Sequence, residues 1–304
     1  MMKALAGYVV SGRWQAVLVT SVSGVLAMLL LPFSCAGAAV VSLVTLHVGI
    51  LSGLQVMALA GAGTLLLYLL AGVHSAFLIS MLLLLWLPCW LVSGVLQQTR
   101  DLGYAMKVAA LFGACLLMLV YLLLGSPAQG WVEILKTVAA MFEDAGLVLQ
   151  GLSDEQLMRD VAGLMTGVVL AWLVLGIIGS LLLGRWWQSI VVHPGAFREE
   201  FCSLRLGYAA GLLTLGVMLL AQLTEGTVSE FAAQLAMILL VPYLLTGLAI
   251  IHGLMLQAGL GKGWLIAVYL LLGLVPQSML LLGGLGLLDT WIDFRRRLAR
   301  GGNG

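Results

Sequence analysis

The sequence has few charged residues. Only 9% of its 304 residues are Asp, Glu, Lys or Arg, and the net charge is +1. No such residue occurs between Trp14 and Gln98, a stretch long enough for several bilayer crossings of about 20 residues each. Without a concentrated basic face, the chain is not a nucleic-acid-binding protein. With 62% hydrophobic residues and a mean hydropathy of +1.13, it has the composition of a polytopic protein embedded in a lipid bilayer.

The sequence also lacks the residue patterns of metal sites and of common enzymes. Its four cysteines are widely separated and form no CxxC pair, so neither a disulfide framework nor a zinc site is indicated. No HExxH motif, no GxSxG motif and no acidic cluster lies in an apolar run. We therefore expect no metal, no cofactor and no enzymatic activity.

Glycine, proline and charge divide the chain into nine apolar segments. Because hydrocarbon cannot satisfy the open edges of strands, we expect these segments to be helices. The prediction is an all-α, polytopic membrane protein with about eight or nine transmembrane segments, forming a single membrane domain over residues 1–304. The first segment resembles a signal peptide, but we interpret it as a retained helix because so many segments follow. The nine are 15–33, 36–53, 54–72, 74–97, 107–125, 161–183, 206–224, 231–256 and 264–288.

One long stretch, residues 126–160, does not look membrane-spanning. It holds six of the 13 acidic residues and only two basic ones. Trp131, Leu135, Val138 and Phe142 recur at helical spacing, which predicts an amphipathic helix lying on the membrane. Such a helix is either a surface linker or a lid over a binding cavity.

Two short patterns predict where helices begin. Ser153–Gln156 and Thr227–Glu230 both fit the capping box, in which a hydroxyl and a carboxylate or amide side chain satisfy free backbone amides. Each stands just before an apolar run. We expect helices to start at both.

Closely spaced glycines predict tight helix packing. Gly49 and Gly53 form a GxxxG pair, and Gly283, Gly284 and Gly286 form a cluster. Glycine lets helix backbones approach closely in a membrane. The first pair is also compatible with an interface for a membrane partner.

Four charges gather in the stretch HPGAFREEFCSLRLG. They are Arg198, Glu199, Glu200 and Arg205. Apolar residues recur at helical spacing beside them, so we predict a short interfacial helix over about 194–205. Charges would collect there because the membrane surface offers water. The alternative is a docking surface for a cytoplasmic partner.

The distribution of basic residues predicts the orientation. Positive charge near span ends resists translocation. Lys3, Arg13 and the arginine-rich tail therefore favour both termini in the cytoplasm, with 185–205 on the same side and 126–160 on the outer face. An even number of crossings is required. A partial crossing by 36–53 would move the loops at Arg100 and 185–205 outside, whereas a break of the last segment at Pro276 and Gly283-Gly284 keeps them inside. Nine full crossings would place the tail outside.

The C-terminal third resembles a known family. Phe197-Arg-Glu-Glu200, His252-Gly253 and Gly286-Leu-Leu-Asp289 before the basic tail resemble the YybS-like family of uncharacterised bacterial membrane proteins. The remaining spans share only a general apolar, glycine-rich likeness. The family is distantly similar to substrate-binding components of energy-coupling-factor transporters. The resemblance implies a multi-pass protein of the bacterial inner membrane and hints at transport, without implying a mechanism.

Polar residues inside spans are the natural candidates for a site, because each costs free energy unless it is paired or hydrated. His47, Gln55 and His74 fall in neighbouring segments and are expected to converge. His252 and Gln277 are expected to face each other across the last two spans. A lone histidine within a membrane span more often makes an ordinary hydrogen bond between helices than binds a ligand. The candidate partner-docking residues are Arg198, Glu199, Glu200, Arg205, Arg295, Arg296 and Arg297.

Two functions remain open from the sequence. The first is a transport-type component that binds a small, partly apolar molecule through the polar residues within its spans. The second is a non-transporting scaffold that recruits a cytoplasmic or membrane protein partner through the interfacial helix and the arginine tail.

Overall fold

The computed structural model describes residues 2–72, 76–144, 154–257, 259, 261, 263–275 and 277–292. All regular structure in these ranges is helical, which confirms the predicted all-α class. The helices are α1 (Met2–Val10), α2 (Arg13–Leu26), α3 (Pro32–His47), α4 (Ile50–Leu70), α5 (Ala76–Met81), the π-helical turn η1 (Leu82–Trp86), α6 (Leu87–Thr99), α7 (Leu102–Leu124), α8 (Ala128–Asp144), α9 (Glu155–Val192), α10 (Ala196–Cys202), α11 (Tyr208–Leu223), α12 (Gly226–Gln257), α13 (Gly263–Leu274) and α14 (Gln277–Ile292).

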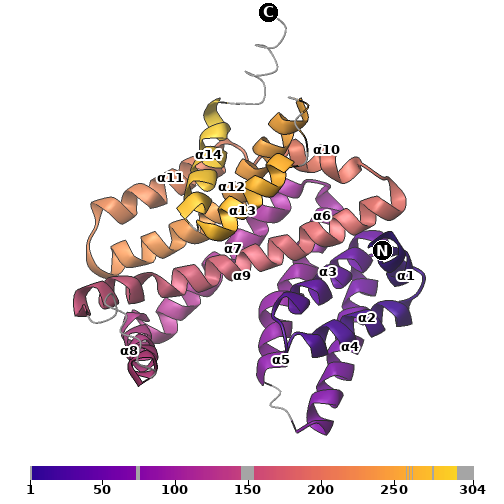
Figure 1. The fold of residues 1–304 in the computed structure, drawn as a ribbon, viewed down its shortest axis with the longest axis horizontal. Helices are drawn as coiled ribbons and strands as arrows, with labels where there is room; N and C mark the ends of the chain where they lie inside the picture. Colours follow the sequence, from indigo (N-terminus) through magenta and orange to yellow (C-terminus); the bar gives the residue numbers. More distant parts are fainter. Residues whose placement is uncertain are drawn as a thin grey trace, which may run out of the picture.

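The longest helix, α9, organises the fold. Its 38 residues span about 57 Å at 1.5 Å per residue. It crosses the middle of the molecule, with α1 to α5 on one side and α11 to α14 on the other (Figure 1). It packs against α3, α7, α8 and α12. Ile177, Ile178 and Leu181 are fully buried near its middle. The hydrophobic core is therefore continuous along this helix.

Glycines set the closest helix contacts. A Cβ atom on Gly247 would collide with the backbone carbonyl of Leu282, and one on Gly286 with the carbonyl of Tyr243. Helices α12 and α14 therefore meet backbone against backbone, as small residues permit in membrane proteins. Gly184 makes a similarly close approach to α3. In the predicted glycine cluster at 283–286, Gly286 is the residue that must lack a side chain for α14 to pack against α12.

The span over 76–99 is one helix with a local widening. Elements α5, η1 and α6 run continuously, and the π-helical turn ends just before Pro88. Proline lacks a backbone N–H, so a widened turn here relieves the missing hydrogen bond. Trp86 closes this turn and is fully buried, donating from Nε1 to the Ser34 carbonyl at 3.0 Å. This hydrogen bond joins the π-helical turn before α6 to the start of α3.

Five helices of the described chain are long and apolar enough to cross a bilayer. They are α4, the α5–α6 helix, α7, α9 and α12, and the bent pair α13–α14 makes a sixth if it counts as one span. Helices α3 and α11 have 16 residues each, about 24 Å, which is shorter than a hydrocarbon core of about 30 Å. The structure thus shows a helical, multi-pass architecture with fewer full-length spans than the nine apolar segments suggested.

One predicted helix boundary is wrong, and the predicted break of the last segment is confirmed only in part. The break expected at 53–54 lies instead at Val48 and Gly49, where Gly49 has φ of 139°, a conformation that favours glycine. Gly53 lies inside α4, close against Thr45 of α3. The break in the last segment separates α13 from α14 with a bend of 119°. The expected Gly283-Gly284 break is absent, because both glycines lie within α14.

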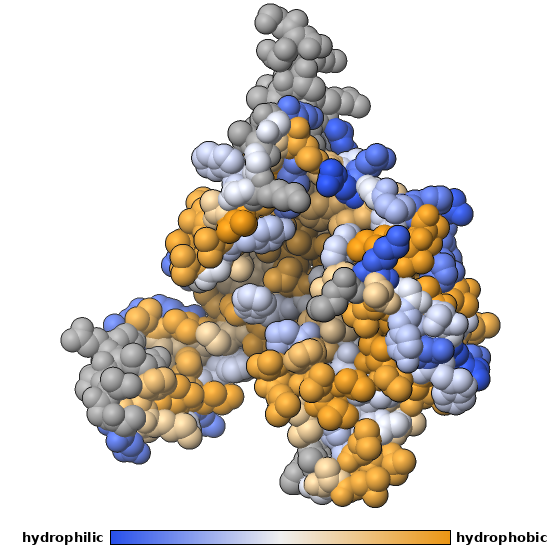
Figure 2. All heavy atoms as spheres, turned by 45° about the vertical axis from the view of Figure 1, so that its right-hand side comes forward, coloured by the Kyte–Doolittle hydropathy of each residue, from blue (hydrophilic) through white to orange (hydrophobic). Residues whose placement is uncertain are grey.

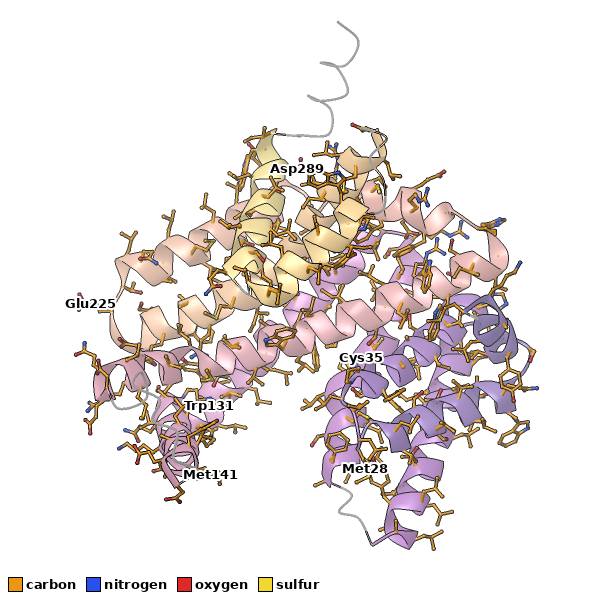
Figure 3. The ribbon with its side chains drawn as sticks, viewed as in Figure 1. Met28, Cys35, Trp131, Met141, Glu225 and Asp289 are labelled. Carbon is orange, nitrogen blue, oxygen red and sulfur yellow. The ribbon has the colours of Figure 1, made fainter. Side chains whose placement is uncertain are left out.

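The two predicted amphipathic helices are both present. Helix α8 has no fully buried residue, and Trp131 attaches it to α9 by donating from Nε1 to the Thr166 hydroxyl at 2.8 Å (Figure 3). Helix α10 is shorter than expected and ends at Cys202. The reason is that Leu204 turns into the core, where it is 3% exposed, so the apolar face does not continue to Tyr208.

One predicted capping box differs in detail and the other does not form. Helix α9 begins one residue late, with Asp154 as the N-cap that accepts hydrogen bonds from the amides of Gln156 and Leu157. The predicted cap residue Ser153 lies outside the described residues. Helix α12 already begins at Gly226, so Thr227 lies inside it rather than capping it.

The charged residues separate toward two ends of the molecule. The basic end contains the turns at 11–12, 48–49 and 100–101 and the connection 193–207; it holds Lys3, Arg13, Arg100, Lys107, Arg185, Arg198 and Arg205. The acidic end contains α8, the start of α9 and the α11–α12 turn at Glu225 (Figure 3). Hydrophobic side chains cover most of the face between (Figure 2). Trp291 packs on Tyr208 with ring centroids 5.8 Å apart, so α14 ends at the basic end, as α1 does.

Candidate functional site

The site is built around the sharp turn between α9 and α10. Ser189, near the end of α9, donates to the His193 carbonyl at 2.9 Å and accepts from the Phe197 amide at 3.2 Å. Gly195 caps α10 with φ of 101°, which a residue with a side chain rarely adopts. One buried hydroxyl therefore fixes both ends of the turn, and α10 folds back over α9 in a defined position.

Helix α10 directs its charges to opposite sides. Two residues along a helix correspond to a rotation of about 200°, so Arg198 and Glu200 face opposite ways. Oε2 of Glu200 accepts a hydrogen bond of 2.8 Å from Nε of Arg185 in α9 and lies 2.8 Å from Nη2 of the same side chain. Arg185 also donates to Gln188 at 2.8 Å, and Gln188 donates to the Leu46 carbonyl at 2.8 Å. The network joins α3, α9 and α10 beside a water-accessible surface.

A large cavity of the described chain lies on the Arg198 side of α10. Its volume is about 700 Å³, within the range of cavities that enclose small organic ligands. It lies between α9, α10 and α12, with α1 and α13 at its sides. We call it the aromatic cavity; its lining is Lys3, Leu182, Trp186, Ser189, Ile190, Pro194, Gly195, Phe197, Arg198, Phe201, Cys202, Leu245, Leu248, His252 and Tyr269.

Four rings form a continuous wall of this cavity. Phe197 stacks on Phe201 with centroids 5.8 Å apart, Phe201 meets the edge of His252 at 5.7 Å, and His252 meets Tyr269 at 6.0 Å. The Nδ1 atom of His252 lies 2.9 Å from the Leu248 carbonyl, which can only accept. Nδ1 therefore carries the proton, and Nε2 is 3.5 Å from the Tyr269 hydroxyl.

A second cavity lies on the Glu200 side of α10. It measures about 490 Å³ and is far more polar. We call it the polar cavity; its lining is Leu46, Leu96, Gln97, Arg100, Arg185, Gln188, Ser189, Val192, His193, Ala196 and Glu200. Helix α10 is thus a partition, with an apolar space on one side and a hydrated, charged space on the other.

The predicted ligand residues are placed very differently from one another. His252 lines the aromatic cavity. Its described ring partners are Phe201 and Tyr269, whereas Gln277 is exposed at the start of α14, eight residues beyond Tyr269. The expected His252–Gln277 pair is therefore replaced by a His252–Tyr269 pair.

The structure describes two of the three residues that were expected to converge, His47 and Gln55. His47 is exposed at the end of α3, and Gln55 is exposed on α4, where it accepts a 3.4 Å hydrogen bond from Arg13. Both lie at the basic end, away from the lining of the aromatic cavity. His74 lies outside the described residues.

The predicted docking residues also lie in different places in the structure. Arg198 lines the aromatic cavity and Glu200 is paired with Arg185. Glu199 and Arg205 are exposed at the basic end. The remaining candidates, Arg295, Arg296 and Arg297, lie outside the described residues.

Sequence reasoning missed most of the lining of the aromatic cavity, including Lys3 and Tyr269. Lys3 belongs to the amino-terminal helix and reaches the cavity because α1 packs on α9. Tyr269 lies in an apolar run that gives no local signal of a site. Both arrive through contacts between distant segments, so a single sequence offers no pattern that identifies them.

The acidic helix α8 is not a lid for the aromatic cavity. The cavity lies at the basic end, and α8 packs on the opposite part of α9 (Figure 1). A smaller space of about 450 Å³ lies between α8 and α9 and is lined by charged residues of both. Within the described ranges, no group of three or more His, Cys, Asp or Glu side chains is arranged to hold a metal ion.

Comparison of the chain with protein-family models, with curated proteins and with solved structures finds no match in any of the three.

Proposed function

We propose that this protein is a transport-type membrane component that binds a small, partly apolar molecule in the aromatic cavity. The observation that carries the proposal is the cavity itself, with its volume of about 700 Å³ and its predominantly apolar and aromatic lining. Binding sites for small organic molecules are typically concave, mostly apolar and provided with a few convergent polar groups. His252, Tyr269 and Ser189 are such groups here.

The proposal includes a setting in the cell. The protein is a multi-pass protein of the bacterial inner membrane and a member of the YybS-like family, with about eight crossings and both termini in the cytoplasm. Supporting observations are the concentration of basic residues at one end and the arrival of both α1 and α14 at that end. The aromatic cavity then opens on the cytoplasmic side of the membrane.

The proposed activity is binding rather than catalysis. The polar groups of the aromatic cavity are used structurally, since Ser189 holds the turn before α10 and the Nδ1 atom of His252 meets a backbone carbonyl. A nucleophile with an adjacent base is the usual requirement for covalent catalysis. In the lining, the hydroxyl of Ser189 donates to the His193 carbonyl rather than to a base.

Mass spectrometry of the purified protein tests the proposal. We expect a small molecule to co-purify with the wild-type protein and to be lost in Leu248→Trp, because the added ring would fill the cavity that Leu248 lines. Leu240→Trp is the matched control: it lies on the same helix but lines a separate apolar groove between α9, α12 and α14. A wild-type protein without ligand, or equal loss in both variants, would contradict the proposal.

A scaffold that recruits a protein partner is the second candidate. The exposure of Glu199 and Arg205 favours it. Cysteine-directed crosslinking from Glu199→Cys, with Gln129→Cys on α8 as a control at the other end, distinguishes the two functions. A specific adduct from residue 199, together with no bound small molecule, would favour the scaffold.

A further inference from the structure

We propose that the ligand of the aromatic cavity is an anionic amphiphile, with a carboxylate or phosphate head held by Lys3 and Arg198 and an apolar chain lying between α9 and α12. This inference rests on the proposed function and adds the chemical class of the ligand.

The charge of the cavity lining indicates the kind of head group that the ligand has. Two side chains that are permanently charged at neutral pH line the cavity, Lys3 and Arg198, and both are basic. The two acids that follow Arg198 in α10 are absent from the lining: Glu200 is held by Arg185 on the opposite side of α10, and Glu199 is exposed. The cavity thus has positive charge without an acidic side chain in its lining, which favours a negatively charged head.

The position of Lys3 follows from how α1 is docked. Ala6 and Val9 are 0% and 1% exposed, and they pack in a cluster with residues of α3 and α9. Residues three apart lie on the same side of a helix, so Lys3 stands at the edge of this buried face. Lys3 is exposed and lines the cavity from the side of α1.

The apolar part of the cavity lining indicates that the ligand also has an apolar chain. Leu182, Ile190, Leu245 and Leu248 line the cavity together with the rings of α10 and α13. A small inorganic anion gains nothing from such walls, and transfer of an ion into an apolar environment is costly. A ligand that leaves its charge at the mouth and buries an apolar chain inside satisfies both parts of the lining.

The volume limits the ligand further. About 700 Å³ corresponds to the cavities that hold single drug-sized molecules. We therefore expect a single-chain amphiphile. It arrives either free from the cytoplasm or laterally from the membrane, where single-chain anionic lipids offer the same head and chain.

Binding of dodecyl phosphate, compared with dodecanol, tests the inference. Both are measured with the full-length protein in a neutral detergent. In the double variant Lys3→Gln/Arg198→Gln we expect dodecyl phosphate to bind at least tenfold more weakly and dodecanol to change less than twofold, because only the charged head loses its partners. The control double variant Lys107→Gln/Arg159→Gln removes the same net charge elsewhere and should leave both affinities unchanged.

Two outcomes overturn the inference and separate it from the proposed function. Equal binding of dodecyl phosphate and dodecanol, unaffected by the double variant, would refute the anionic class while leaving an apolar ligand site. Absence of binding by both compounds, with no effect of Leu248→Trp, would refute the proposed function itself.

A second arm identifies the source of the ligand. The protein is placed in nanodiscs of phosphatidylcholine, with or without added lysophosphatidic acid. Competition by this lipid against dodecyl phosphate supports the same head-binding site and lateral entry from the membrane. Binding of dodecyl phosphate without such competition supports entry from the cytoplasm.

Discussion

At the scale of single residues, the ion pair between Arg185 and Glu200 holds the partition between the two cavities. The side chains are 24% and 22% exposed, and both Nε and Nη2 of Arg185 lie 2.8 Å from one carboxylate oxygen of Glu200. Removing one partner of a half-buried pair leaves the other desolvated without compensation. We expect Glu200→Gln to lower the free energy of unfolding by about 1–3 kcal/mol.

The matched comparison is an exposed pair of the same kind. Glu155 and Arg159 are 70% and 71% exposed and lie one helical turn apart at 2.9 Å. Pairs of this kind contribute about 0.5 kcal/mol or less. Thermal unfolding in detergent should therefore leave Glu155→Gln close to wild type. Equal destabilisation of both variants would show that α10 is not held by this ion pair.

Gly286 provides a second prediction for a single residue. A Cβ atom there would meet the backbone of Tyr243 and Gly247, which cannot move without shifting α12, whereas a Cβ on Gly284 meets nothing within 4 Å. Gly286→Ala should lower the melting temperature by several degrees. Gly284→Ala, on the same helix, should leave it unchanged or slightly raised, because alanine favours the helix. Similar values for the two variants would mean that α12 and α14 do not pack this closely.

At the scale of helices, the start of α9 and the start of α12 differ in how they are capped. Asp154 accepts two amide hydrogen bonds before α9, whereas Thr227 lies exposed inside α12. Loss of an N-cap side chain costs about 1 kcal/mol. We expect Asp154→Ala to speed hydrogen exchange in the first turn of α9 about fivefold, and Thr227→Ala to have little effect on α12. Unchanged exchange in Asp154→Ala would contradict the cap.

The same two helices show what a sequence can and cannot predict. Apolar runs and the polar residues between them predicted that α9 and α12 exist, because burial in hydrocarbon depends on composition over many residues. They did not predict which residue caps α12, since Gly226 and Thr227 offer competing starts that only the preceding turn decides. Likewise, His252 was found as a polar residue in a span, whereas Lys3 and Tyr269 depend on packing between segments far apart in the chain.

Helix α10 illustrates the limit at the level of a site. Its cluster of charges was visible in the sequence, and it was interpreted as a solvated face or a docking surface. Helical rotation alone places Arg198 and Glu200 on opposite sides of α10. Helices α9 and α12 determine that one of these sides faces an apolar cavity. A cluster of charged residues predicts a polar helix surface. The cavity or neighbour that this surface faces depends on how the surrounding helices pack.

At the scale of the whole molecule, the two ends carry opposite charge. The segment 126–160 has six acidic and two basic residues, a net charge of −4, whereas the basic end gathers residues from α1, α2, α6, α7, α9 and α10. Positive charge resists translocation across the membrane, and acidic segments cross with little resistance. The orientation that this favours also places the mouth of the aromatic cavity, with Lys3 and Arg198, on the cytoplasmic side.

We therefore predict that residues 129 and 199 lie on opposite sides of the membrane. Gln129 on α8 and Glu199 on α10 are both exposed and belong to opposite ends of α9. Single cysteines at these positions, in a background in which the four native cysteines are alanine, are treated with a membrane-impermeant maleimide on intact cells. Gln129→Cys should be labelled, and Glu199→Cys only after the membrane is opened. The reverse labelling pattern would mean that the orientation in the membrane is inverted and that the aromatic cavity opens on the outer face. Labelling of both cysteines from outside would mean that α9 does not cross the bilayer.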